Sequence, residues 1–196
     1  ITSDSRMLEL KDDIRALEFI NDPVLIRGET GTGKELIAQA LHGSRGPTEK
    51  EPKAGRFVAV NCPALSVDLM CSEFFGHVKG AFTGAISDKV GKFAAAYKGT
   101  LFIDEVGDMN STMQAALLRV LQEGVITRVG DNEELPVYTR IVCATNKNLE
   151  EMVEKGLFRL DLLSRINTFE LRTVPLRDRP DDIAKIIAHW ESLDKA

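Results

Sequence analysis

The chain has 196 residues, of which 43% are hydrophobic, and this length and composition predict one domain of ordinary size with a substantial core. Its formal net charge of −5 at pH 7 gives no overall attraction to nucleic acid, so we expect any DNA contact to be made by a missing domain. No apolar run approaches the roughly 20 residues that a membrane span needs, which excludes a membrane-spanning helix.

Helical patterns alternate along the chain with short apolar runs rich in β-branched residues, and this alternation predicts an α/β fold. The first half predicts a helix over residues 5–20, a strand over 23–26, a helix over 35–42, a polar surface loop over 43–55, a strand over 57–60 and a helix over 65–75. The second half predicts a strand over 99–105, a helix over 111–123, a hairpin over 125–137, a strand over 140–144, two further helices, a strand over 167–171 and a helix over 181–192.

A phosphate-binding loop is predicted between the first strand and the helix that follows it. Residues 28–34 have the G-x-x-x-x-G-K spacing, in which backbone N–H groups curl around phosphate oxygens and the lysine reaches the terminal phosphates. The phosphates would then lie at a helix N-terminus, where unpaired N–H groups favour anions. The alternative is a glycine-rich turn without a ligand. The residues expected to bind nucleotide are Gly28, Glu29, Thr30, Gly31, Thr32, Gly33, Lys34 and Glu35, together with Asp104.

One position departs from the general pattern of such loops. Glu35 stands where a Ser or Thr hydroxyl normally contacts magnesium. The general pattern alone therefore does not account for the usual hydroxyl contact with magnesium in this chain.

Two neighbouring carboxylates, Asp104 and Glu105, end the strand predicted over residues 99–105. Ligand sites of open α/β sheets lie at the carboxyl ends of the strands. Because side chains alternate along a strand, we expect the two acids to point differently, one toward magnesium and one toward the water that attacks the γ-phosphate. A strand end capped by exposed acids is the alternative, and the phosphate loop earlier in the chain favours an ATPase.

A second glycine-bearing motif, GAFTGA, follows at residues 80–85. Glycine loses much conformational freedom on ordering, so we expect a mobile loop with Phe82 as an exposed contact tip. A buried turn is the alternative, whereas the polar surroundings exclude a membrane-helix packing motif. The predicted partner-binding loop comprises Gly80, Ala81, Phe82, Thr83, Gly84 and Ala85.

Together these segments resemble the AAA+ domain of bacterial sigma-54-dependent transcriptional activators, the enhancer-binding proteins. The resemblance covers nearly the whole chain in order, and GAFTGA is its most specific element because other AAA+ proteins lack it. In that family a Glu normally follows the loop lysine, so Glu35 fits. The matching segments are GETGTGKE (28–35), VNC (60–62), FGH (75–77), GAFTGA (80–85), GTLFIDE (99–105), LLRVLQE (117–123), RVG (128–130), ATN (144–146), FR (158–159) and PLR (175–177).

The resemblance implies a P-loop NTPase fold, namely an AAA+ α/β subdomain whose central parallel sheet is flanked by helices. It implies that ATP and Mg²⁺ are the cofactors. Lys34 would contact the β- and γ-phosphates, Asp104 would organise magnesium, and Glu105 would polarise the attacking water.

Two asparagines receive roles from the same resemblance. Asn61 matches the residue that holds the glutamate in check until the target engages, and Asn146 matches the sensor of the γ-phosphate. The residues alone favour plainer alternatives, a strand-end turn for Asn61 and a helix N-cap for Asn146.

Arg159 and Arg165 correspond to the family's candidate arginine fingers, which would reach the nucleotide of a neighbouring subunit in a hexameric or heptameric ring. On one continuous helix these positions would be rotated by about 240°, so we expect them to have unequal roles. The alternative is that both are surface arginines paired with Asp161 or Glu154.

The implied partner is the sigma-54 factor within RNA polymerase holoenzyme, engaged by residues 80–85 as the loop moves with the γ-phosphate state. Residues 125–137 would form a second loop beside it. Val78 departs from the family, which usually has Glu there, so the coupling of loop to nucleotide is expected to differ in detail.

We expect residues 1–196 to be an AAA+ α/β subdomain cut from a longer protein, because the chain opens without Met and stops before the helical lid of AAA+ proteins. Regulatory and DNA-binding domains are expected elsewhere. Three cysteines without a C-x-x-C pair predict reduced thiols in a cytoplasmic protein. The alternatives to a sigma-54 activator ATPase are a generic AAA+ remodeller, which would not explain residues 80–85, and a nucleotide-gated interaction module with little turnover.

Overall fold

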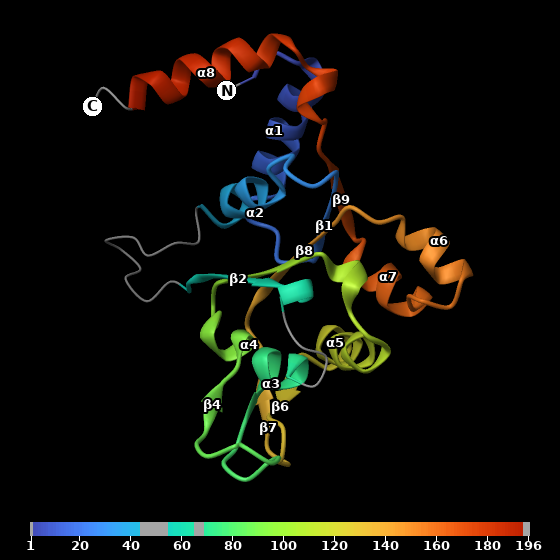
Figure 1. Cartoon of the computed structure of the whole chain (residues 1–196). Helices are drawn as coiled ribbons and strands as arrows, with labels where there is room; N and C mark the ends of the chain where they lie inside the picture. Colours follow the sequence, from blue (N-terminus) through green and yellow to red (C-terminus); the bar gives the residue numbers. More distant parts are fainter. Residues whose placement is uncertain (1, 44–54, 65–68, 194–196) are drawn as a thin grey trace.

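The computed structural model describes residues 2–43, 55–64 and 69–193. A five-stranded sheet with the order β2-β5-β8-β1-β9 forms its centre, and all neighbouring strands in it are parallel (Figure 1). Its strands are β1 (Val24–Arg27), β2 (Phe57–Asn61), β5 (Thr100–Asp104), β8 (Arg140–Thr145) and β9 (Phe169–Arg172). The prediction of a central parallel sheet is confirmed.

Helices cover both faces of this sheet, because successive side chains on each strand point to opposite sides. On β5, Phe102 packs in one buried cluster with residues of α1 and α2, whereas Leu101 and Ile103 pack in the other, with residues of α3, α4, α5 and α7. The helices are α1 (Ser5–Leu17), α2 (Lys34–His42), α3 (Met70–Phe75), α4 (Lys92–Ala95), α5 (Ser111–Glu123), α6 (Leu149–Glu154), α7 (Leu160–Ile166) and α8 (Asp181–Leu193).

Local sequence signals explain where several helices begin and end. The Asp4 side chain accepts hydrogen bonds from the backbone N–H groups of Arg6 and Met7 and so caps α1. Asn110 caps α5 in the same way, and Gly124, with φ of 68°, ends that helix in the left-handed conformation that glycine adopts readily.

Every strand and helix predicted within the described residues is present, with ends shifted by up to three residues at α1. Predictions for residues 44–54 and 65–68 lie outside the described part. The sequence did not predict α4 or the two-stranded pair of β3 (Gly76–His77) and β4 (Lys89–Val90), which are too short to carry a periodic pattern. In the described part of the chain, no helix is both long and apolar enough to cross a membrane.

Two loops lie side by side at one end of the molecule, at the bottom of Figure 1. One connects β3 to β4, and the other is the hairpin of β6 (Val125–Thr127) and β7 (Glu134–Pro136). The N–H of Val78 donates to the carbonyl of Val129 at 3.1 Å, and the N–H of Val129 donates to the carbonyl of Gly76 at 2.9 Å. The predicted pairing of a second loop with residues 80–85 is thus present in the fold.

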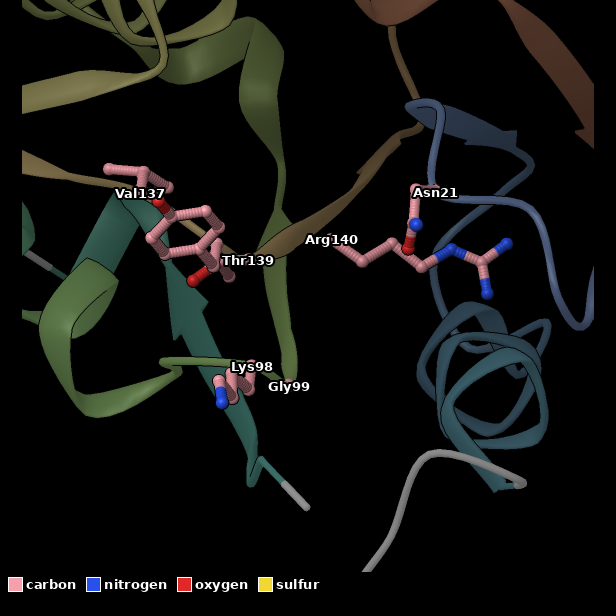
Figure 2. A pocket seen from close by; sticks show the side chains of 7 residues that line it. Asn21, Lys98, Gly99, Val137, Thr139 and Arg140 are labelled. Atoms are coloured by element: carbon pink, nitrogen blue, oxygen red, sulfur yellow. The ribbon is translucent and has the colours of Figure 1, made fainter. Parts of the chain in front are cut away.

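A buried arginine at the start of the central strand β8 joins two helices, at the opposite ends of the strands from the phosphate loop. The Arg140 guanidinium donates to the carbonyl oxygens of Leu41, at the end of α2, and of Leu17, at the end of α1, both at 2.8 Å. Figure 2 shows this side chain pointing from β8 toward those helices, away from Lys98. Arg140 and Lys98 are among the residues that line a hollow of about 390 Å³. The Arg140 charge therefore compensates the negative ends of two helix dipoles.

Candidate functional site

The phosphate loop connects β1 to α2, and its lysine is held inside the loop. The Lys34 side chain is only 7% exposed, and its Nζ atom donates to the carbonyl oxygens of Gly28 and Glu29 at 3.1 and 3.3 Å. Gly31 and Gly33 have φ of 80° and 90°, which only glycine adopts without strain. Helix α2 begins at Lys34, so the loop lies at a helix N-terminus as predicted.

The two predicted acids reach the same place from β5. Asp104 is the last residue of β5, and Glu105 follows it with φ of 52° and ψ of 53°. This left-handed conformation costs a non-glycine residue roughly 1–2 kcal/mol, and such strain concentrates at functional sites. Glu105 points differently from Asp104 because of this turn, and not through strand alternation as the sequence suggested.

An ion pair connects Glu105 to the loop. The Nζ atom of Lys34 lies 3.3 Å from Oε1 of Glu105, and both side chains are largely buried. A hollow of about 450 Å³ opens at this point. The residues that line it are Thr30, Gly31, Gly33, Lys34, Glu35, Leu36, Gln39, Asp104 and Glu105.

Asn61 and Asn146 lie at the carboxyl ends of the strands next to these acids. The Asn61 amide donates to Asp104 Oδ2 at 3.4 Å, and its oxygen accepts from the N–H of Ala64, as a strand-end turn residue does. Of the two acids, Asn61 therefore contacts Asp104, and its restraint on Glu105 stays a prediction.

Asn146 bridges the loop and the glutamate. Its backbone N–H donates to Oε2 of Glu105 and its side-chain amide donates to Oγ1 of Thr30, both at 3.1 Å. The alternative of a helix N-cap is wrong, because Asn148 caps α6. Asn146 thus contacts both the phosphate loop and Glu105, and its role as a γ-phosphate sensor stays a prediction.

Carboxylate oxygens fit a magnesium ion at this position. Mg²⁺ is commonly held by one or two carboxylates together with substrate phosphates and water. Asp104 and Glu105 supply carboxylates in the same hollow as the phosphate loop. Glu35, whose Oε1 accepts from Gln39 at 3.2 Å, lines the hollow too. Among the described residues no group of three or more His, Cys, Asp or Glu side chains forms a metal cage, so phosphate oxygens and water would complete the shell.

The candidate arginine fingers lie on the surface beside α7. Arg159 precedes the helix in an extended conformation and forms a two-point ion pair with Asp161, at 2.9 and 2.7 Å. Arg165 lies in the last turn of α7 and is exposed. Neither is among the described residues that line the hollow of the phosphate loop. The surface pairing considered as an alternative is thus present for Arg159, and the two arginines do lie in different local settings.

Residues 80–85 form a hydrogen-bonded loop far from the phosphate loop (Figure 1). The N–H of Gly80 donates to the carbonyl of Ala85 at 2.8 Å, and the N–H of Ala85 donates to the carbonyl of Phe82 at 3.0 Å. Phe82 is 37% exposed and its ring meets His77 edge-on at 5.0 Å, whereas Ala85 is buried. The loop is therefore a closed turn on the surface with a half-exposed aromatic tip.

A buried thiol lies close to the acids. Burial, reinforced by the carboxylates of Asp108, Asp104 and Glu105, raises the pKa of Cys62 to about 12. Burial also raises the pKa of Cys143. Both thiols stay protonated at neutral pH and are poor nucleophiles there.

Sequence reasoning missed residues that contact the loop from β9 and beyond. The Thr173 hydroxyl donates a hydrogen bond to Oγ1 of Thr32 at 2.7 Å. Arg177 forms a bidentate ion pair with Glu29, which holds the pKa of the Glu29 carboxyl below its usual value. Arg177 belongs to the PLR segment at residues 175–177. Thr173 carries no pattern that would have singled it out. Exposed Leu36 also lines the hollow.

Comparison with known proteins agrees with this geometry. The sigma-54 interaction domain family matches residues 1–172. The Nif-specific regulatory protein of Azorhizobium caulinodans is 55% identical over 171 residues, which are 87% of this chain and 27% of the relative. The anaerobic nitric oxide reductase transcription regulator NorR of Escherichia fergusonii is 49% identical over 185 residues, which are 94% of this chain and 36% of the relative. The chain thus spans roughly a third or less of these relatives' length.

Solved structures agree as well. NtrX from Brucella abortus in complex with ADP matches with a TM-score of 0.85 and 32% identity, covering 96% of this chain and 40% of that chain. The Hsp104-ADP complex of S. cerevisiae matches with a TM-score of 0.60 and 18% identity, covering 93% of this chain and 35% of that chain, which shows a likeness in fold alone. With its AAA+ α/β fold and these relatives, the chain belongs to the sigma-54 interaction domain family, the AAA+ domains of sigma-54-dependent transcriptional activators.

Proposed function

We propose that this chain binds and hydrolyses ATP with Mg²⁺, and that the nucleotide cycle remodels sigma-54 RNA polymerase holoenzyme in the cytoplasm so that the promoter opens. One observation carries the nucleotide part of the proposal. Lys34, Asp104 and Glu105 come from two different elements and line a single hollow beside a glycine-rich loop. The crystal structures of the relative NtrX with ADP and with ATP give further support.

Lys34 is suited to bind the β- and γ-phosphates. It is fixed by two carbonyl oxygens of its own loop, so little conformational freedom is lost when a phosphate arrives. Its third contact, to Oε1 of Glu105 at 3.3 Å, is made to a side chain outside the loop and is the one that a phosphate oxygen would replace. We therefore assign Lys34 to charge compensation of the phosphates.

Asp104 is suited to hold magnesium. Its carboxylate stands at the end of β5, with Oδ1 accepting from the N–H of Glu105 at 3.0 Å and Oδ2 accepting from Asn61 at 3.4 Å. When bound, Mg²⁺ would neutralise charge that develops on the phosphate oxygens. Asn61 then has the role of orienting this carboxylate, in addition to the restraint on Glu105 that the family resemblance suggests.

Glu105 is suited to orient the attacking water. Its carboxylate is held at Oε1 by Lys34 and at Oε2 by the N–H of Asn146. Replacement of the Lys34 contact by phosphate would leave Oε1 available to accept a proton from a water molecule. Asn146 also donates to Thr30 in the loop. A movement of Asn146 in response to the γ-phosphate would therefore alter the positions of both Glu105 and the loop.

The arginines and the surface loop are assigned to contacts with other subunits and with the target. Arg159 and Arg165 are exposed and stand apart from the hollow in the same chain, which supports a role in trans, in a hexameric or heptameric ring. Residues 80–85, with Phe82 at the tip, are the proposed contact with the sigma-54 factor. DNA binding is assigned to another part of the full protein.

Calorimetric titration of Mg-ATP and Mg-ADP tests the phosphate loop directly. The chain should bind both, and Lys34→Ala should weaken binding at least tenfold, roughly the loss expected for a charge-assisted contact. The matched control is Lys155→Ala, which removes an exposed lysine paired with Glu151 on α6. Equal affinity of the parent and Lys34→Ala would overturn the assignment.

A further inference from the structure

The segment that follows β9 touches the phosphate loop at two separate points. Thr173 comes directly after β9, and Arg177 lies in the short 3₁₀ turn at Leu176–Asp178 that leads to α8. Both side chains reach residues of the loop, although neither is among the residues that line the nucleotide hollow.

Thr173 starts a chain of hydroxyl contacts that ends beside the catalytic lysine. Its backbone N–H donates to the carbonyl of Arg27 at 2.9 Å, which extends the sheet pairing and fixes the position of Thr173. Its hydroxyl donates to Oγ1 of Thr32 at 2.7 Å, and the Thr32 hydroxyl donates to the carbonyl oxygen of Glu29, also at 2.7 Å. That same carbonyl oxygen accepts from Lys34 Nζ. The hydroxyl chain therefore supports the peptide group that holds the lysine.

Gly28 packs closely against Thr173 and Thr32, with no room for a side chain. A Cβ atom built on Gly28 would lie 1.7 Å from Oγ1 of Thr173 and 3.0 Å from Oγ1 of Thr32. The first distance is far inside van der Waals contact. Gly28 is thus required here for the approach of Thr173, independently of any approach by phosphate.

Arg177 holds the same residue of the loop from its outer side. Its guanidinium donates through Nη1 and Nη2 to the two carboxylate oxygens of Glu29, each at 2.5 Å. The Arg177 and Glu29 side chains are 64% and 55% exposed, and a lone exposed ion pair contributes little. This pair, however, has two parallel hydrogen bonds, which fix the orientation of the Glu29 side chain. Glu29 is also the residue whose carbonyl oxygen accepts from the Thr32 hydroxyl, so Arg177 and the hydroxyl chain hold the same residue.

We propose that Thr173 and Arg177 are positioning residues of the phosphate loop, which act through Thr32 and Glu29 to keep the loop carbonyls and Lys34 in the arrangement that receives nucleotide phosphates. This inference rests on the proposed nucleotide binding. Because the segment runs straight into α8, it also gives that helix a mechanical connection to the loop.

The test compares four variants of the 196-residue chain in three measurements. Thr173→Val replaces the hydroxyl by a methyl group of similar size, Thr173→Ser restores the hydroxyl, and Arg177→Gln removes the ion pair. The control, Arg15→Gln, removes a similarly exposed pair with Asp12 on α1. The measurements are affinity for Mg-ADP by calorimetry, amide hydrogen exchange of residues 28–34 without nucleotide, and melting temperature.

We expect Thr173→Val to bind Mg-ADP about threefold to tenfold more weakly, the effect of one lost hydrogen bond, with faster exchange confined to the loop. Thr173→Ser should recover most of the affinity, Arg177→Gln should show a smaller loss, and Arg15→Gln should match the parent. Unchanged affinity and unchanged loop exchange in both Thr173→Val and Arg177→Gln would overturn the proposal. So would a lower melting temperature with faster exchange throughout the chain, because that pattern is general destabilisation.

The affinity of the parent chain for Mg-ADP separates a failure of this inference from a failure of the proposed function. If the parent failed to bind Mg-ADP, nucleotide binding itself would be wrong and the positioning role for nucleotide would fall with it. If the parent bound Mg-ADP while loop exchange and affinity were insensitive to Thr173→Val, only the inference would be wrong.

Discussion

The Nζ atom of Lys34 lies 3.3 Å from Oε1 of Glu105, although the two residues are 71 positions apart in the sequence. The contact joins the start of α2 to the turn after β5, where Glu105 adopts its left-handed conformation. The lysine proposed to bind phosphate and the carboxylate proposed to activate water thereby line the same hollow.

Glu105→Gln should retain nucleotide binding and lose ATP hydrolysis. The amide keeps the size of the side chain and can still accept from the N–H of Asn146, but it is a much weaker base toward water. Loss of general-base assistance typically costs about a hundredfold or more in rate. Calorimetry with Mg-ATP and a phosphate-release assay measure the two properties separately. Equal losses of binding and hydrolysis would make Glu105 a structural residue.

Arg159 should act on the nucleotide of a neighbouring subunit. In a longer chain that includes the lid, hydrolysis per subunit should rise with protein concentration. Mixing Arg159→Ala with Lys34→Ala should restore activity that neither variant has alone, because one contributes an intact nucleotide site and the other an intact finger. Arg119→Ala, which removes another exposed, ion-paired arginine, is the matched control and should be fully active. If mixed oligomers form without recovery at any ratio, the assignment in trans is wrong.

Phe82→Ala and Thr83→Ala should leave ATP hydrolysis near the parent rate and abolish stable engagement of sigma-54 holoenzyme. Loss of a central aromatic anchor often costs about 2 kcal/mol, close to a thirtyfold weaker affinity. Gel-shift assays with a transition-state analogue and an ATPase assay on the lid-containing chain provide the readouts. Phe19→Ala serves as control, since Phe19 is 79% exposed and lies just beyond α1. A joint fall in melting temperature and hydrolysis for Phe82→Ala would indicate instead a core position emptied of its side chain.

Acid should weaken the attachment of α8 to the N-terminal segment. Asp182 accepts hydrogen bonds from the Thr2 hydroxyl, the Ser3 N–H and Arg179, which lower its pKa from 3.8 to about 2. Because the folded-state pKa is depressed, this stabilisation is present above the unfolded value and is lost as pH falls through the folded one.

The measurement is a pair of melting curves for the parent and Asp182→Asn. The variant should melt lower near pH 6, and the gap should narrow as pH falls toward about 2.5. Asp12→Asn, in an exposed pair with Arg15, is the control and should show no such narrowing gap. A gap that stays constant over this range would mean that the Asp182 charge does not contribute.

Local sequence patterns were enough to predict the helices, the strands and the segments that carry the chemistry. The spacing of glycines and lysine predicted the loop at residues 28–34, and short apolar, β-branched runs predicted the strands, because both are local properties of neighbouring residues. Asp104 and Glu105 were predicted to join the loop because parallel strands place their carboxyl ends at one edge of the sheet, and the structure brings them to one hollow.

The contacts between residues around that loop could not be predicted in the same way, because they join segments that are distant in the sequence. The left-handed turn at Glu105, the contact of Asn61 with Asp104, and the approach of Thr173 into the space left by Gly28 depend on how separate strands are packed side by side. The same holds for Arg140. The sequence predicts only that it belongs to a strand, whereas in the structure its guanidinium donates to backbone carbonyls at the ends of two helices. Hydrogen bonds between distant segments follow from the three-dimensional placement of backbone carbonyls and hydroxyls, and no spacing in the linear chain encodes their distances.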